Sequence, residues 1–399
     1  MSCQEGWIED ANRYIAQTYA RLPICLIKGE GSYVWDTEGH KYLDLVMGIG
    51  VNGLGHCHPR VVAAIREQAG KLLHVSNLYH IEPQIQLAKA LCRISFADRA
   101  FFCNSGGEAN EACIKLARKY AKDSGHPERY EIITMEGSFH GRTLATLTAT
   151  AQTKYHKGFE PLPEGFKYVP FNDLKAVEAT VGSKTAAIML EPIQALGGVN
   201  VPADDFLPGL RKLCDEKGLL LILDEVFTGF GRTGAMFCHQ RYGIEPDVMA
   251  LAKALAGGLP VGAMLAKEKV AQSFSPGTHA ATFGGNPLVA SVGVEVLKII
   301  QEEGLVAYAE EMGNYFMGRL KDLQRKFGFI KEVRGKGLLI GVELEFPGKE
   351  IDVRCQEKGL LVNSLGDKVL RIIPALNVKR EEIDQAVTVL DEVLGGMGK

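Results

Sequence analysis

A single lysine, Lys253, lies in the otherwise apolar and glycine-rich run VMALAKALAGG, which extends from Val248 to Gly258. Burying an ammonium group among Met, Ala and Leu side chains is costly, so such a lysine must lose its charge or find a partner. A lysine that is kept neutral is a nucleophile that condenses with an aldehyde. The residue type and its surroundings therefore indicate covalent chemistry.

A carboxylate ends a second apolar run, in LLLILDEVFTGFGRTG. Five apolar residues lead into Asp224 and Glu225 at the expected carboxyl end of a strand. Consecutive side chains of a strand face opposite sides, so only one of the two carboxylates can point at a given ligand. Taken alone, Asp224 fits a cap for the glycine-rich turn equally well. The interval to Lys253 accommodates a strand–loop–strand or strand–helix–strand passage, so both residues can belong to one site.

A third segment, AFFCNSGGEANEACIKLARKY, predicts a strand, a small polar loop and a helix with Glu108 in its first turn. The loop residues Ser105, Gly106 and Gly107 allow a ligand to approach the unpaired amides of the helix N-terminus, which is a phosphate site. A plain turn with a helix cap has the same pattern. A phosphate cradle, a buried carboxylate and a buried lysine together match what pyridoxal 5′-phosphate requires.

The elements that position these residues follow an α/β pattern. Short apolar runs alternate with helical patterns from about residue 98 onward, which predicts a largely parallel sheet covered on both faces. The helix that includes Phe206 and Cys214 is expected to end at Gly218. The six runs are AFFCN, EIITM, AAIMLEP, LLLILDE, DVMALAK and VGAMLAK.

The two ends of the chain predict a smaller α+β domain. Residues 30–45 have the pattern of a hairpin, and PLVASVGVEVLKIIQEEG begins a long helix. GLLIGVEL and VLRIIP predict strands, and EEIDQAVTVLDEVL predicts a final helix. We expect residues 1–60 and 288–399 to form the smaller domain and residues 61–287 the larger one.

Composition excludes several classes of function. A net charge of −3 and a pI near 6.4 favour neither nucleic acid nor an anionic membrane as a partner. No apolar run is long enough to span a bilayer, and nine cysteines without CxxC spacing favour reduced thiols, so we expect a cytoplasmic protein. The triplet from His56 to His58 is not expected to bind a metal, because adjacent side chains rarely point at one ion.

The ordered motifs NSGGEANEACIKLAR, SFHGRT, EPIQ, LDEVFTGFGRTG, LAKALAGGLP and ATFGGNP resemble those of the class III aminotransferases. This is a fold-type I family that depends on pyridoxal phosphate, and the resemblance, which extends from about Gly29 to Pro374, is strongest to its members that act on N2-acetylornithine. It implies a large domain with a mainly parallel, seven-stranded type of sheet, a smaller domain from both ends, and a homodimer with shared active sites.

The resemblance also implies roles for individual residues at the cofactor. Lys253 corresponds to the family's Schiff-base lysine and Asp224 to the carboxylate that faces the pyridine nitrogen. Residues 105–107 match the phosphate loop, and Phe139 matches the aromatic side chain stacked on the cofactor ring. Thr282 matches a phosphate contact donated by the other subunit.

Further matches concern the substrate. Arg142 and Arg371 match arginines that hold substrate carboxylates, and a dicarboxylate such as 2-oxoglutarate needs two cationic partners. We also assign Glu191 of EPIQ and Ile49 of GIGVNG to the substrate site. Simpler interpretations are that Phe139 is a core residue, Arg142 a surface charge and Arg371 a partner for a nearby acid. His140 fits either a structural or a functional role.

Three positions depart from the pattern of the family. Gly107 stands where threonine or alanine is usual, so backbone amides must hold the phosphate without a side chain. Leu196 replaces a glutamate that pairs with the Arg371 counterpart while the donor is bound. Phe227 replaces a glutamine that hydrogen-bonds the cofactor's ring oxygen. Without a glutamate at position 196, Arg371 has no acidic side chain there to pair with.

The resemblance implies a ping-pong transamination in which the terminal amine of N2-acetylornithine passes to 2-oxoglutarate. The products are N-acetylglutamate 5-semialdehyde and glutamate, as in arginine biosynthesis. Ornithine, succinylornithine, N-succinyldiaminopimelate and 4-aminobutyrate are alternative donors, and an aminomutase or decarboxylase is more distant. A nucleotide-binding oxidoreductase would need a GxGxxG that opens a helix, which TGFGRTG does not match. A non-catalytic binding protein on the same fold is the last alternative.

Overall fold

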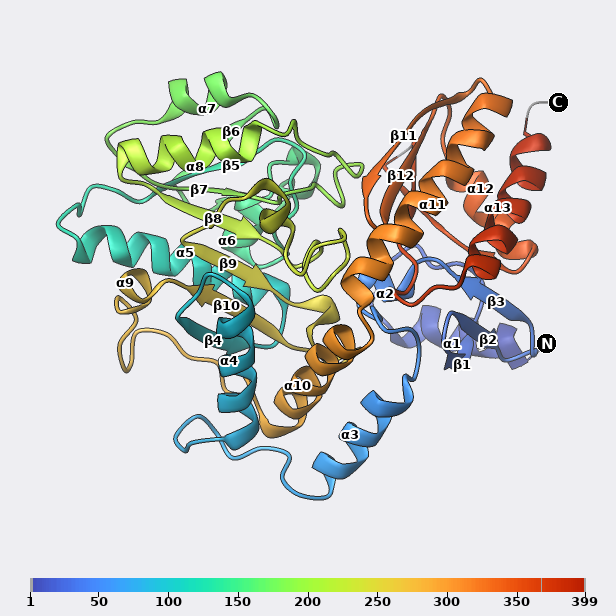
Figure 1. Cartoon of the computed structure of the whole chain (residues 1–399), viewed down its shortest axis with the longest axis horizontal. Coiled ribbons are helices and arrows are strands. Elements are labelled where there is room, and N and C mark those ends of the chain that lie inside the picture. The colour runs from blue at the N-terminus through green and yellow to red at the C-terminus, as the bar shows by residue number, and fades with distance from the viewer. Residues whose placement is uncertain (1–2, 367, 398–399) are drawn as a thin grey trace.

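The computed structural model describes residues 3–366 and 368–397. Its ribbon has two lobes, a larger one around a seven-stranded sheet and a smaller one around two four-stranded sheets (Figure 1). Both ends of the chain lie in the smaller lobe. This confirms the predicted fold class, an α/β domain together with a smaller α+β domain built from both chain ends.

The seven-stranded sheet contains all six runs that the sequence predicts as strands. Strand β10 is antiparallel to both of its neighbours, and the remaining pairs are parallel. The seventh strand, β6, was not predicted, because it is a short edge strand with only one buried residue. In spatial order the strands are β4 (Arg99–Cys103), β10 (Gly262–Ala266), β9 (Val248–Leu251), β8 (Leu220–Asp224), β7 (Thr185–Leu190), β5 (Glu131–Met135) and β6 (Phe166–Val169).

Helices cover both faces of this sheet. Alternate side chains of β8 pack against helices on opposite faces. Leu220 and Ile222 pack in one cluster with helix α5 (Gly106–Asp123). Leu221 and Leu223 pack in another with α8 (Phe206–Lys217), which ends at the left-handed Gly218 as predicted. Because side chains alternate along a strand, Asp224 faces the same side as Leu220 and Ile222, toward α5.

The smaller lobe joins the two chain ends through strand pairing. Strand β13 near the C-terminus lies parallel to β3 near the N-terminus, and β2 and β3 form the predicted hairpin. One sheet contains β1 (Leu26–Glu30), β2 (Tyr33–Asp36), β3 (Lys41–Asp44) and β13 (Leu360–Leu361). The other contains β11 (Ile330–Lys336), β12 (Leu339–Leu344), β15 (Val369–Ile372) and β14 (Asn363–Leu365). The helices of the smaller lobe are α1 (Cys3–Tyr14), α11 (Leu305–Lys326), α12 (Lys349–Glu357) and α13 (Arg380–Gly395).

Helix α10 (Pro287–Glu302) begins where the sequence predicts a long helix, and the Asn286 side chain caps it by accepting from Val289 N. It packs against α3 (Pro59–Ala69) and α4 (Glu82–Ile94), and α11 continues into the smaller lobe. The domain limits at 60/61 and 287/288 stay predictions. The remaining short helices are α2 (Met47–Gly50), α6 (Leu144–Ala149), α7 (Leu174–Thr180), α9 (Glu268–Ala271), η1 (Thr153–Tyr155), η2 (Cys238–Tyr242) and η3 (Lys253–Ala256).

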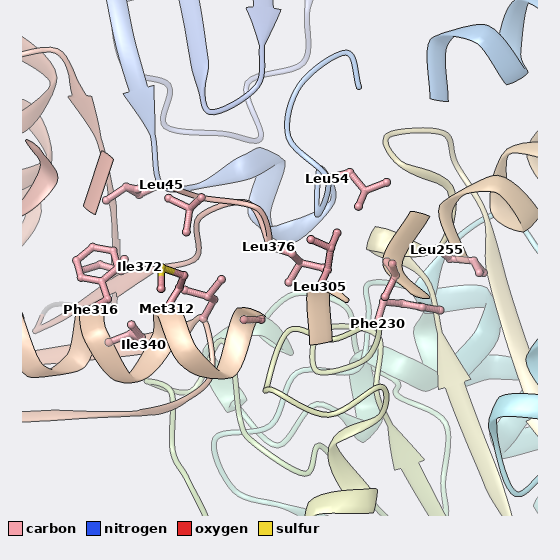
Figure 2. Close-up of a cluster of buried hydrophobic side chains, with 14 of the residues drawn as sticks. Leu45, Leu54, Phe230, Leu255, Leu305, Met312, Phe316, Ile340, Ile372 and Leu376 are labelled. Carbon is pink, nitrogen blue, oxygen red and sulfur yellow. The ribbon is translucent and has the colours of Figure 1, made fainter. Parts of the chain in front are cut away.

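One hydrophobic cluster connects the two lobes (Figure 2). Leu45 and Leu54 from the N-terminal segment meet Leu376 near the C-terminus, and Phe230 and Leu255 contribute from the larger lobe. The lobes therefore share a core and pack closely. Within residues 3–366 and 368–397, no helix is long and apolar enough to cross a membrane.

Candidate active site

A cavity of about 420 Å³ lies at the carboxyl ends of the strands in the larger lobe. Ser105 follows β4, Glu191 follows β7, Asp224 ends β8, and Lys253 lies two residues beyond β9. Open α/β sheets bind ligands at this edge, and the volume is in the range of small-molecule sites. The tertiary structure thus brings together side chains from four separate segments.

Lys253 begins η3 with φ of 43°, in the left-handed region that a residue other than glycine enters at a cost of about 1–2 kcal/mol. Its side chain lines the cavity, and burial lowers the pKa of Lys253 to about 8. Asp224 and Glu191 raise this pKa and Arg371 lowers it, but burial is the larger effect. A substantial fraction of the amine is therefore neutral near pH 8.

Asp224 is only 4% exposed, and donors surround its carboxylate. Oδ2 accepts from Asn110 Nδ2 at 2.6 Å and lies 2.8 Å from His140 Nδ1. Oδ1 accepts from Val226 N at 3.1 Å, so Asp224 also caps the turn that follows β8. These contacts fix the orientation of the carboxylate. The site therefore contains a fixed anion on the α5 side of the sheet.

The neighbouring Glu225 points elsewhere. Its carboxylate accepts from the backbone amides of Cys238 and His239 at 2.6 and 2.9 Å, and from Thr228 Oγ1 at 3.0 Å. It does not line the cavity formed by Asp224 and Lys253. Of the two adjacent carboxylates, Asp224 alone faces this site, as the alternation of strand side chains requires.

The segment from β4 into α5 forms the predicted strand, loop and helix. Ser105 is the N-cap of α5, and its Oγ accepts from Glu108 N at 3.1 Å. The amides of Gly106 and Gly107 come first in the helix and have no helical acceptor. A Cβ at Gly106 would lie 2.8 Å from Val226 Cγ1, so that position requires glycine. At Gly107 a Cβ would meet nothing closer than 3.8 Å.

Glu191 is buried beneath the cavity and fixes the loop that carries Phe139. Its Oε1 accepts from Phe139 N at 2.8 Å, and its Oε2 accepts from Ala195 N at 3.1 Å. Burial raises the pKa of Glu191 to about 7; His140 lowers this pKa and Asp224 raises it. Both Phe139 and Glu191 line the cavity.

The two predicted substrate arginines differ in exposure. Arg371, in β15, is 1% exposed; its Nη2 donates to Asn363 Oδ1 at 2.6 Å, and burial lowers the pKa of Arg371 to about 10. Arg142 is exposed, with its guanidinium 4.1 Å from the ring centroid of Tyr155 and 5.3 Å from that of Phe139. One arginine is therefore built into the protein interior and the other lies at the surface beside the loop of Phe139.

Four predicted site residues are not among those that line the cavity, namely Arg142, Arg371, Thr282 and Ile49. Thr282 is exposed and lines a separate hollow with Ser76 and Asn77. Ile49 is 47% exposed, and Val51 is the residue of that segment that lines the cavity. The roles of these four, like those of the other site residues, stay predictions.

Sequence reasoning missed Asn110, and it left His140 open. Asn110 is 1% exposed within a stripe of α5 whose other buried members are apolar, including Ala109 and Cys113. The signal that could have identified Asn110 is a polar residue on the apolar face of a predicted helix. Its contact with Asp224 depends on the packing of α5 against β8.

Comparisons with known proteins agree with this geometry. A family model described as Aminotransferase class-III matches residues 14–394. The acetylornithine aminotransferase of Methanocaldococcus jannaschii is 53% identical over 390 residues, which cover 98% of each chain. The chain belongs to the class III aminotransferases. The six ordered motifs had identified this family from the sequence.

Solved structures of ornithine aminotransferases have the same fold. The ornithine aminotransferase of Toxoplasma gondii ME49 has a TM-score of 0.97 at 33% identity, covering 100% of this chain and 96% of its own. A second Toxoplasma gondii ornithine aminotransferase structure, described as having partial occupancy of PLP at the active site, has a TM-score of 0.94 at 33% identity. It covers 98% of this chain and 94% of its own.

The cavity of this class III chain fits pyridoxal phosphate. Gly106 keeps the N-terminus of α5 free of a side chain, where the amides can bind a phosphate. His140 Nε2 and Asn110 Oδ1 are buried without hydrogen-bond partners among the described residues, beside the Asp224 carboxylate. An amine, a carboxylate and the free amides of a helix N-terminus thus surround one space, beside the unpartnered polar atoms of His140 and Asn110.

Proposed function

We propose that this protein transfers the terminal amine of N2-acetylornithine to 2-oxoglutarate, giving N-acetylglutamate 5-semialdehyde and glutamate. The observation that carries the proposal is the convergence of Lys253, Asp224 and the N-terminus of α5 on one cavity. The choice of donor is supported by the 53% identity to the Methanocaldococcus jannaschii acetylornithine aminotransferase. Identity to the ornithine aminotransferase structures is lower, at 33%.

Pyridoxal phosphate would be held by the amides of Gly106 and Gly107 at its phosphate, by Asp224 at its ring nitrogen, and by Phe139 on its ring face. When bound, it supplies an electron sink for the carbon that carries the amine. Asp224, which accepts from Asn110 Nδ2 and lies 2.8 Å from His140 Nδ1, would favour a protonated ring nitrogen when the cofactor is bound.

Lys253 is the residue that carries a proton between the reacting carbon atoms. With a pKa of about 8, its Nζ is neutral often enough to act as a base, and it regains a proton readily. Nζ accepts the proton from the amine-bearing carbon of the donor and returns a proton when the acceptor reacts. Burial keeps bulk water away from this exchange.

Arginines orient the substrates. Arg371 is buried against the ring of Phe227, which lines the cavity, and its planar guanidinium suits a bidentate contact with a carboxylate of 2-oxoglutarate. Arg142 at the surface supplies the second cation for a dicarboxylate. Glu191 supports the site through the backbone amide of Phe139.

The proposal includes a homodimer with shared active sites in the cytoplasm. Thr282 is exposed beside Phe283, which is 58% exposed, and Leu78 of the same hollow is 84% exposed. Apolar side chains left open in this way favour burial against a partner. The nine cysteines are free thiols, the state expected in a reducing compartment.

The reaction of added pyridoxal phosphate with the apoprotein should depend on pH. Because burial lowers the pKa of Lys253 to about 8, the neutral amine increases with pH, and the rate of covalent uptake should be half-maximal near pH 8. Stopped-flow absorbance across pH 6–10.5 measures this rate. In Asp224→Asn the midpoint should move to lower pH, because the Asp224 charge raises this pKa. A wild-type midpoint above pH 10 would contradict the assignment.

Gly107→Thr should tighten cofactor binding. The position has room for a Cβ, with its nearest neighbour 3.8 Å away, and the added hydroxyl can donate to the phosphate. One such hydrogen bond contributes about 1 kcal/mol, so the Kd for pyridoxal phosphate should fall about fivefold, as measured by equilibrium dialysis. The matched variant Gly106→Ala should weaken binding, because its Cβ would meet Val226 at 2.8 Å.

A donor panel tests the proposed function. The purified protein is assayed with 2-oxoglutarate and N2-acetylornithine, ornithine, succinylornithine, N-succinyldiaminopimelate or 4-aminobutyrate, and the donors are compared by kcat/KM. We expect N2-acetylornithine to be highest, and a higher value for another donor reassigns the substrate. A colourless protein that gains no absorbance with pyridoxal phosphate would instead favour an oxidoreductase or a non-catalytic binding protein.

A further inference from the structure

The ring of Phe227 lies close to two cationic side chains, Lys253 and Arg371. Lys253 Nζ is 4.3 Å from the centroid of its ring, and Arg371 Cζ is 5.1 Å from the same centroid. Both distances are within the range of a cation–π interaction, which is strongest where water is excluded. The ring is 7% exposed, so the contacts are largely desolvated.

The position of this ring is set by the smaller lobe. Gly50, with φ of 78°, lies against it so closely that a Cβ there would come within 3.2 Å of Phe227 Cε1 and Cζ. Phe227 also packs in one cluster with Ile193 and Ile373. The side chain is therefore confined, and its π system stays directed at the two cations.

Arg371 forms no direct ion pair among the described residues, and Glu191 raises its pKa only through space and by less than burial lowers it. Its Nη2 donates to the Asn363 side chain at 2.6 Å, and Nη1 donates to Ala195 O at 3.5 Å. Its Nε is buried without a partner. The residue after Ala195 is Leu196, an apolar side chain that lines the cavity. An isolated buried guanidinium is costly, so another group must offset part of that cost.

We propose that Phe227, which lines the cavity, is a positioning residue whose ring holds the Arg371 guanidinium beside the cavity, in place of a directly paired acid, and keeps its N–H groups available to a substrate carboxylate. An acid paired with Arg371 would have to be displaced by an incoming carboxylate. An aromatic ring leaves the N–H groups free, because it attracts the cation through its face. The inference rests on the proposed function, in which Arg371 binds 2-oxoglutarate.

The variant Phe227→Leu removes the ring and keeps an apolar side chain. Glutarate, a dicarboxylate that carries no amine or keto group, is titrated into the protein loaded with pyridoxal phosphate, and its Kd is measured by calorimetry. We expect this Kd to rise about tenfold in Phe227→Leu and to return to within about twofold of wild type in Phe227→Tyr. The KM for 2-oxoglutarate should rise in parallel, while kcat changes less than twofold.

Phe230→Leu is the matched control. Phe230 belongs to the same loop after β8, but packs against Phe237 in the core with ring centroids 5.9 Å apart. The same substitution there should lower the Tm and leave the Kd for glutarate unchanged. A wild-type Kd in Phe227→Leu, or an equal rise in Phe230→Leu, overturns the proposal.

A double-mutant cycle separates positioning from general damage. In an Arg371→Met background, Phe227→Leu should cause no further loss of glutarate affinity, because the ring acts through the arginine. An equal loss in both backgrounds overturns the proposal. Glutarate binding involves no amine donor. These affinities therefore test the role of Phe227 even if the donor panel reassigns the substrate.

A second variant keeps the test decisive if Phe227→Leu fails to fold. Leu196→Glu places an acid next to Ala195, whose carbonyl already accepts from Arg371. This acid should compete for the guanidinium and raise the Kd for glutarate about tenfold near neutral pH. Unchanged glutarate affinity in Leu196→Glu overturns the inference.

Discussion

Lys253→Ala is expected to lower kcat/KM by at least about 10⁴-fold, because it removes both the nucleophile and the proton carrier of the site. Lys253 is the lysine that lines the cavity, and burial holds its pKa near 8. Reduction with borohydride should no longer join the protein and pyridoxal phosphate covalently. Mass spectrometry of the reduced protein measures this directly.

Lys267 provides a matched control for this experiment. It follows β10 and its Nζ lies 3.6 Å from Asp247, just before β9, so it is at the opposite edge of the sheet from Lys253. Lys267→Ala should keep both activity and the covalent label. If the label forms at another lysine in Lys253→Ala, the role assigned to Lys253 is wrong.

Asp224→Asn should reduce turnover by about 10³-fold while the protein stays folded. The substitution preserves the shape of the side chain and removes its charge. Without that anion the ring nitrogen of the bound cofactor is no longer kept protonated, and charge that develops in the transition state loses its stabilisation. Steady-state kcat, with cofactor content measured on the same sample, checks the prediction.

Glu225→Gln, at the next residue, should lower the stability of the protein and not its turnover. Glu225 accepts hydrogen bonds from Cys238 N and His239 N outside the cavity, and an amide nitrogen would face those donors. We therefore expect the Tm to fall, with kcat per folded enzyme nearly unchanged. Unchanged turnover in Asp224→Asn would refute the catalytic role of that carboxylate.

The sequence predicted most of the residues of the candidate site, but not the contacts among them. Lys253 and Asp224 were recognisable because each is a charged residue in an apolar run, and burial of such a residue needs a reason. Asn110 was missed because its contact with Asp224 depends on how α5 packs across β8. The sequence showed that Leu196 and Phe227 depart from the family, but not that one aromatic ring faces both Lys253 and Arg371.

The sequence by itself determined the fold class, because the period of apolar residues follows the geometry of strands and helices. It determined the family as well, since six motifs in one order are specific. Only the tertiary structure decided which neighbours each charged group has, and hence its pKa. Those neighbours come from segments far apart in the chain, and the free energy of a charge depends on the distances and burial that folding creates.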